Sequence, residues 1–176
     1  MRQQAIGNLI GATGGTAFVL ANANEPLNTT LGAVLKVLAV LALAALVAIT
    51  IRLGKKPAAQ GDGTAGGFTK GYWLVVAGEV VALFGGFQVL RALDAPVQAN
   101  VAWIAVVVGI HFIAFVMVWK TWTIAIPGVV MTALGAIGLA MTPTSALAWV
   151  PIVSGMLSGV TLLACSLFFT VRALRS

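Results

Sequence analysis

The sequence predicts an all-α integral membrane protein with six transmembrane helices, built as a single domain over residues 1–176. Hydrophobic residues make up 60% of the chain and charged residues only 8%, and the mean hydropathy is +1.06. A soluble domain of this length needs a charged surface that so few ionisable side chains cannot supply. The apolar residues also gather into runs of about twenty, which is the length of a helix that crosses a bilayer.

The net charge of +6 does not indicate nucleic-acid binding, because the basic residues cluster between the apolar runs and not in one surface patch. The chain contains no phosphate-binding loop, dinucleotide fingerprint or haem motif. Its lone Cys165 cannot form an intrachain disulfide, and one His, one Glu within an apolar run and one Cys make a poor metal-ligand set. We therefore expect no cofactor, no metal site and no catalytic activity.

The first predicted helix covers residues 5–23 and is rich in Gly and Thr. Arg2 before it and the small residues Ala21 and Ala23 at its end also fit a secretory signal with a cleavage site. We expect a retained helix, which a corner containing a Glu-Pro pair separates from the next. The second helix covers residues 31–51, which are dense in Leu, Ala and Val.

Residues 52–70 form the one long polar segment, with Gly, Pro and several basic residues, and are expected to be a cytoplasmic loop. The third helix covers residues 71–93 and the fourth covers residues 99–119. An Asp-Ala-Pro corner joins them. Because that corner is short, the two helices are expected to lie side by side and antiparallel.

The fifth helix covers residues 123–141 and the sixth covers residues 147–171. Each has a proline near its start, Pro127 and Pro151, where a missing backbone N–H costs little. Short polar corners precede both helices, so they too are expected to pack against their neighbours in sequence.

The distribution of positive charge predicts the orientation. With six helices starting inside, eight of the ten basic residues fall on one face of the membrane. The positive-inside rule makes that face cytoplasmic and places both termini in the cytoplasm. We expect a multi-pass protein of a bacterial inner membrane. The eight residues are Arg2, Arg52, Lys55, Lys56, Lys70, Lys120, Arg172 and Arg175.

The odd-numbered helices share a spacing of small residues seven apart, which returns to nearly the same helix face. Such stripes let helix backbones approach closely in a membrane. The spacing favours a degenerate repeat of three αα-hairpins, although coincidence is the alternative in a chain with 20 glycines. The candidate helix-packing residues are Gly7, Gly14, Gly78, Gly85, Gly128 and Gly135.

Glu79 and His111 are the ionisable side chains that the sequence places deep in the bilayer. Glu79 comes nine residues after Lys70, and His111 comes nine residues before Lys120. At about 1.5 Å of rise per residue, both lie roughly 13 Å from the same membrane face, near the middle of a hydrocarbon core of about 30 Å. Equal depth allows contact without establishing it. The pair predicts a proton relay or a weak cation site, and the alternative is a hydrogen bond that only holds helices together.

Three functions follow from this pattern, in descending order of support. The first is a small transporter or channel-like protein that handles a proton, cation or small solute through Glu79 and His111. The second is a non-catalytic membrane subunit or scaffold that packs against another membrane protein through its glycine stripes. The third, a lipid-modifying enzyme, has the weakest support because acid–base groups are so few. The expected partners are the lipid bilayer and either further copies of this chain or another membrane protein, with no nucleic acid.

Overall fold

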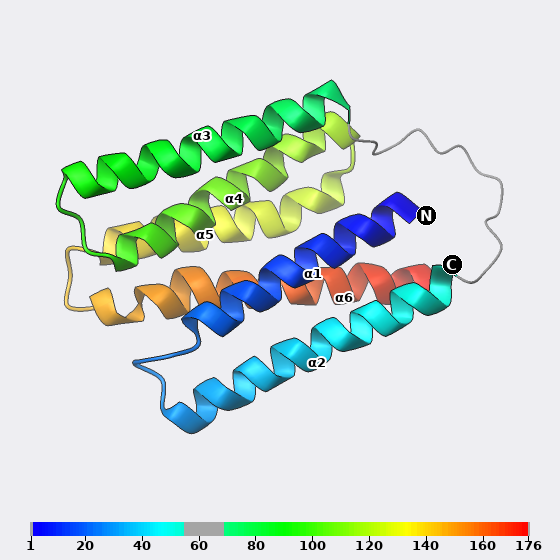
Figure 1. Cartoon of the computed structure of the whole chain (residues 1–176), viewed down its shortest axis with the longest axis horizontal. Helices are drawn as coiled ribbons and strands as arrows, with labels where there is room; N and C mark the ends of the chain where they lie inside the picture. The colour runs from blue at the N-terminus through cyan, green and yellow to red at the C-terminus, as the bar shows by residue number, and fades with distance from the viewer. Residues whose placement is uncertain (1, 55–68, 176) are drawn as a thin grey trace.

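The computed structural model describes residues 2–54 and 69–175, and this part of the chain folds into six α-helices with no strand (Figure 1). Five segments are long and apolar enough to cross a membrane: Thr29–Arg52, Lys70–Ala92, Gln98–Trp119, Trp122–Met141 and Leu147–Arg172. The first helix is not among them, and Gly, Thr and Asn taken together are more numerous in its sequence than in any other helix. The helices are α1 (Arg2–Asn22), α2 (Thr29–Gly54), α3 (Lys70–Ala92), α4 (Gln98–Trp119), α5 (Ala125–Met141) and α6 (Leu157–Arg175).

Two predicted boundaries need correction. The segment 52–70 was expected to be all loop, but α2 continues through Arg52 to Gly54, and α3 begins at Lys70. The polar residues that flank each apolar run can form the same backbone hydrogen bonds as the run itself, so each helix extends beyond its apolar part. The rest of that loop, residues 55–68, lies outside the described residues.

The sixth predicted helix, residues 147–171, is three helical segments in succession. A 3₁₀ turn (Leu147–Trp149) leads into a π-helical turn (Pro151–Met156), and only then does α6 begin. Pro151 is the first residue of the π-helical turn, where its missing backbone N–H costs little, and regular α-helix begins only at Leu157. A second 3₁₀ turn (Trp122–Ile124) precedes α5 in the same way.

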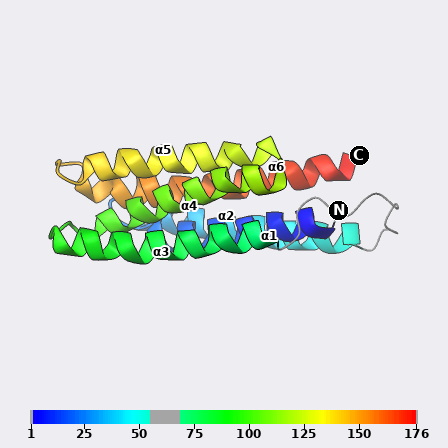
Figure 2. The same ribbon diagram turned by 90° about the horizontal axis from the view of Figure 1, so that it is seen from above.

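The helices form an elongated bundle in which all axes run roughly along the long dimension (Figure 1). Pair α4–α5 and pair α1–α6 have the most extensive contacts, and α5 also packs on α6. Seen from above, α5 and α6 lie in one layer and α1, α2 and α3 in the other, while α4 crosses obliquely between them (Figure 2). Helices α2 and α3 are therefore peripheral, and no residue of α3 is buried.

Glycines set the closest helix contacts. A Cβ added at Gly135 of α5 would lie 2.6 Å from the backbone N of Val106 and 2.7 Å from the backbone O of Ala102, both on α4. A Cβ added at Gly128 would lie 2.8 Å from the backbone O of Gly109. Because the atoms met are backbone atoms, any larger residue would push α4 and α5 apart.

The predicted glycine stripes behave differently in the other two odd-numbered helices. Gly7 and Gly14 of α1 and Gly78 and Gly85 of α3 have nothing within 4 Å of an added Cβ. The helix-packing glycine of α1 is instead Gly15, whose Cβ would lie 2.7 Å from the backbone O of Gly159 on α6. The shared spacing is thus a packing motif inside the described molecule only in α5. Gly7, Gly78 and Gly85 are exposed and Gly14 is half-buried, and a Cβ added at any of the four would meet open space.

Candidate functional site

One face of α3 holds Glu79. The half-buried positions of α3 recur at helical spacing and mark the side that packs on α4, whereas the intervening residues are exposed. Glu79 belongs to the half-buried set, nine residues from the first residue of a continuous helix. A carboxyl group therefore sits near the middle of α3 and faces the bundle, and not the outside of it.

His111 of α4 completes a pair with Glu79. His111 Nδ1 lies 2.9 Å from Glu79 Oε2, and the two side chains are 13% and 20% exposed, respectively. The antiparallel arrangement of α3 and α4 brings the two residues to the same level. The sequence showed only that this contact was possible, and the structure makes it.

The pair is a close ion-pair contact with poor hydrogen-bond alignment. In the described part of the chain, no acceptor is placed so that His111 Nδ1 forms a well-aligned hydrogen bond. The Glu79 carboxylate oxygen is nevertheless within ion-pair distance of Nδ1. The arrangement can therefore pass one proton between carboxyl and imidazole, or open to admit a small cation beside the carboxylate.

An aromatic cluster adjoins the pair on the side of Lys70 and Lys120. The ring of His111 meets the ring of Phe115 edge-on, with centroids 4.2 Å apart. Phe115 in turn stacks on Trp119, at 4.3 Å, and on Tyr72 of α3, at 5.3 Å. The cluster (Tyr72, Phe115, Trp119) fills the α3–α4 contact between Glu79 and that end of the bundle. Trp119 Nε1 is buried within it and has no hydrogen-bond acceptor among the described residues.

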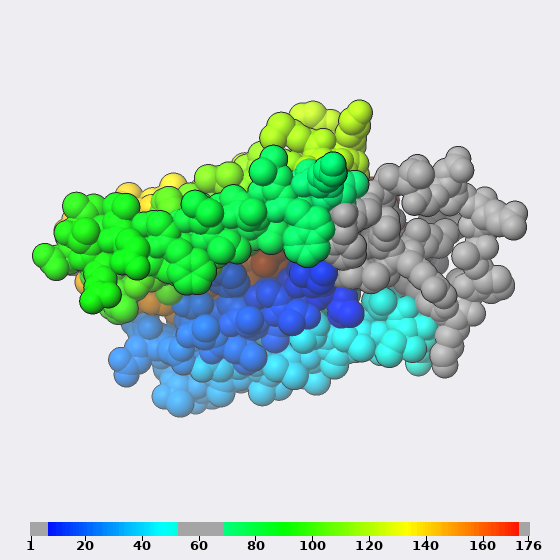
Figure 3. Space-filling view, turned by 45° about the horizontal axis from the view of Figure 1, so that its top comes forward, coloured from blue at the N-terminus to red at the C-terminus, as the bar shows by residue number. Residues whose placement is uncertain are grey.

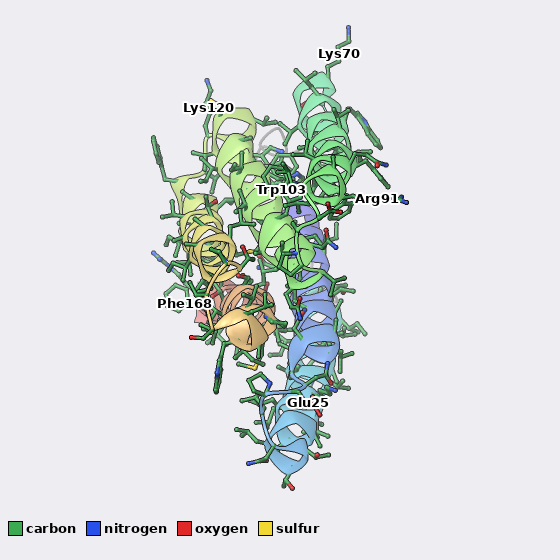
Figure 4. All side chains as sticks on the ribbon, turned by 90° about the vertical axis from the view of Figure 1, so that its left-hand side faces the viewer. Glu25, Lys70, Arg91, Trp103, Lys120 and Phe168 are labelled. Atoms are coloured by element: carbon green, nitrogen blue, oxygen red, sulfur yellow. The ribbon has the colours of Figure 1, made fainter. Side chains whose placement is uncertain are left out.

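Trp103 of α4 contacts α3 on the side of the Glu79–His111 pair that is away from the aromatic cluster. Its indole Nε1 donates a hydrogen bond to the backbone O of Ala82 on α3, at 3.1 Å. Its ring lies directly against Gly86, where no side chain larger than hydrogen would fit. Figure 4 shows Trp103 between the ribbons of α3 and α4. This contact holds the peripheral α3 at a defined height on α4, and so sets the distance between Glu79 and His111.

The ionisable groups are too few for a metal centre of the usual kind. In residues 2–54 and 69–175, no three His, Cys, Asp or Glu side chains come together. Cys165 is half-buried on α6, a helix that is not in close contact with α3. Glu79 and His111 supply two ligands, and protein sites for transition metals use three or four.

The sequence reasoning identified the pair but missed the residues around it. His111, Phe115 and Trp119 are four residues apart in turn, so they lie along one stripe of α4. Trp103 lies eight residues before His111 on the same stripe. This spacing of aromatic residues by fours was visible in the sequence and could have identified the α3-facing side of α4.

No family model, curated protein or solved structure matches this chain. The assignment of a function therefore depends on the geometry of the Glu79–His111 pair and its surroundings.

Proposed function

We propose that this chain is a small membrane transporter or channel-like protein that handles a proton, a cation or a small solute at Glu79 and His111. The observation that carries the proposal is the 2.9 Å contact between these two largely buried side chains. A carboxylate in the middle of an apolar helix is costly in a bilayer, and such groups mark ion and proton pathways. His111 can accept and donate a proton, so the pair has the groups that a proton pathway needs.

The surroundings of the pair favour this function over simple helix adhesion. Trp103 already ties α3 to α4 without any ionisable group, through its hydrogen bond to the backbone O of Ala82 and its contact with Gly86. Two buried ring N–H or N positions, His111 Nδ1 and Trp119 Nε1, lack a well-aligned partner in the described chain. A group serving only as glue is expected to be fully hydrogen-bonded, because an unpaired buried donor costs about 1–3 kcal/mol.

We further propose that the protein lies in a bacterial inner membrane with six spanning helices, both termini in the cytoplasm, and more than one copy per assembly. Support for the orientation comes from charge. Four basic residues of the described chain, Arg52, Lys70, Lys120 and Arg172, are at the same end of the bundle as both termini. That end is the cytoplasmic one under the positive-inside rule.

The test is flux through purified protein in liposomes, with wild type, Glu79→Gln and the matched control Glu25→Gln. The control removes a carboxylate from the exposed corner between α1 and α2. Proton flux and flux of several mono- and divalent cations are measured with trapped indicator dyes. We expect at least one flux to fall tenfold or more in Glu79→Gln and to be unchanged in Glu25→Gln. If every flux is the same in all three proteins, the transport function is wrong.

A thermal-stability screen identifies the ion. Wild type and Glu79→Gln are heated across a range of pH values and a panel of cations. A ligand that binds only the folded protein stabilises it by about 2.7 kcal/mol at a hundredfold excess over its Kd. We expect one cation, or one pH window, to stabilise wild type but not Glu79→Gln. Identical responses of both proteins to every condition would make the pair a structural contact.

A second function, that of a non-catalytic membrane subunit, is favoured by one specific observation. Gly78 and Gly85 of α3 are exposed, a Cβ added at either would meet nothing within 4 Å, and the same helix buries no residue. Small residues on an open helix face allow close approach of another transmembrane helix. Co-purification of a stoichiometric partner from native membranes, lost in Gly78→Leu/Gly85→Leu, would support this function, and its absence would leave transport as the better explanation.

A further inference from the structure

We propose that the corner between α3 and α4 contains a binding site for a phosphate group, whose chemistry is that of an anionic lipid headgroup. The site is a cavity of about 440 Å³ that is widely open to its surroundings, at the end of the bundle opposite the termini. This volume is within the usual range of small-molecule pockets, about 300–1,000 Å³. This site is at the end of α3, whereas the Glu79–His111 pair is near the middle of the helix, and phosphate binding there does not depend on transport.

The lining of the cavity combines one cation and two amides with an apolar rim. Arg91, Gln88 and Asn100 supply N–H donors, and the apolar residues are Phe87, Leu90, Ala95 and Val97. An arginine guanidinium presents parallel N–H groups that match two phosphate oxygens, and amide side chains can donate to a third. The apolar rim suits the upper acyl carbons of a lipid, which a free polar solute does not have.

Arg91 is available for such a ligand. It is exposed, and it forms no ion pair with any acidic side chain in the described residues. Asp94 lies three residues further on, but its contact with Arg91 is a backbone hydrogen bond, and its side chain does not line the cavity. Figure 4 shows Arg91 extending sideways from the end of α3. Its charge is thus not neutralised within the described molecule.

The depth of Arg91 agrees with the position of lipid phosphates. Arg91 is twelve residues beyond Glu79 in one continuous helix, which is about 18 Å at 1.5 Å of rise per residue. The hydrocarbon core ends about 15 Å from the bilayer midplane, and the headgroup region extends to about 20–22 Å. With Glu79 near the midplane, the guanidinium lies at headgroup level, where an arginine meets phosphate and not acyl chains.

The experiment measures thermal stabilisation of purified, detergent-solubilised protein by two phosphate probes. The first probe is short-chain phosphatidylglycerol, and the second is inorganic phosphate. The test variants are Arg91→Gln and Asn100→Ala. Lys36→Gln is the control, because it removes the other positive charge from the same end of the bundle, where Lys36 Nζ bonds Asn24 Oδ1 outside the cavity. Each variant is first checked for wild-type helix content and monodispersity.

We expect a saturable stabilisation of wild type and Lys36→Gln by phosphatidylglycerol, with an apparent Kd at least tenfold weaker in Arg91→Gln and several-fold weaker in Asn100→Ala. Saturation by the lipid alone supports a headgroup as the source of the phosphate, and equal saturation by inorganic phosphate supports a phosphate-bearing solute. The proposal is overturned if neither probe gives a saturable response. It is equally overturned if Arg91→Gln and Lys36→Gln change the response to the same extent. If Arg91→Gln does not fold, the comparison of Asn100→Ala with Lys36→Gln decides the proposal: a weaker apparent Kd in Asn100→Ala alone supports it, and an equal change in both overturns it.

Discussion

At the scale of single residues, the central feature is that two ionisable side chains share one largely apolar helix contact. Glu79 and His111 are 20% and 13% exposed, so each loses most of its hydration and gains the other as a partner. In a bilayer the exchange matters more than in a soluble core, because lipid offers no hydrogen bonds to a group left alone. The pair is therefore expected to act as a unit. Removal of one side chain leaves the other without its partner, and the free-energy cost of burying that remaining polar group is then no longer offset.

A double-mutant cycle tests this coupling. Glu79→Leu and His111→Leu should each lower the free energy of unfolding, because each leaves one buried polar group without its partner. The double variant should be less destabilised than the sum of the two, with a coupling free energy of about 1 kcal/mol or more. Unfolding in mixed micelles, followed by circular dichroism, measures all four proteins.

The non-contact control for this cycle combines Glu79→Leu with Cys165→Ala on α6, which should be additive within about 0.5 kcal/mol. Strict additivity of the Glu79 and His111 substitutions would instead mean that the 2.9 Å contact contributes nothing to stability.

At the scale of helices, the contribution of a glycine to packing depends on whether another helix faces it, and not on its place in a sequence pattern. Gly135, Gly85 and Gly14 occupy equivalent positions in the proposed repeat, yet only Gly135 meets a neighbouring backbone. Helix α5 lies between two other helices, whereas α3 is peripheral. Spacing along the sequence defines a face of a helix, but the packing of the whole bundle decides whether that face is covered.

Alanine substitution at the three equivalent glycines should therefore give opposite results. Gly135→Ala is expected to lower the free energy of unfolding by about 1–3 kcal/mol, because its Cβ would overlap backbone atoms of α4 that cannot move alone. Gly85→Ala and Gly14→Ala meet open space and should be neutral or stabilising by up to about 1 kcal/mol, since Ala is the better helix former. The same micelle unfolding assay measures all three. Equal destabilisation by all three would show that the repeat is used in assembly contacts between molecules.

The sequence predicted the helices well and their interruptions poorly. Hydropathy defined the ends of the third and fourth predicted helices within one or two residues, because long apolar runs have only one stable conformation in a bilayer. It could not predict the π-helical turn at Pro151, since a proline near a helix start fits regular helix equally well. For the site, depth arithmetic placed Glu79 and His111 at one level. The 2.9 Å contact also needs α3 and α4 to pack closely, as they do where Trp103 lies against Gly86, and that packing cannot be read from spacing alone.

At the scale of the whole molecule, the bundle has two chemically different ends. Both termini, the end of α2 and the start of α3 lie at one end, together with most basic residues of the described chain. The other end carries Glu25 and Asp94 along with Arg91 and Lys36. On the face shown in Figure 3, α3 and the α1–α2 hairpin cover most of the surface between these ends. Most side chains on α2 and α3 there are apolar and exposed, as suits contact with acyl chains.

The two ends of the bundle should therefore face opposite sides of the membrane, and cysteine labelling can establish it. Val97 and Trp122 lie just before and just after α4 and are 72% and 80% exposed, so a cysteine at either position should react freely when it is in water. Val97→Cys and Trp122→Cys are made in a Cys165→Ala background, which removes the only native thiol. A membrane-impermeant maleimide added to intact cells should label the first variant and spare the second, and inverted vesicles should give the reverse. Exchange of the two results would invert the proposed orientation while keeping Glu79 and His111 at the same depth. Labelling of both from one side would mean that α4 does not span, and the midplane placement on which the transport proposal depends would be lost.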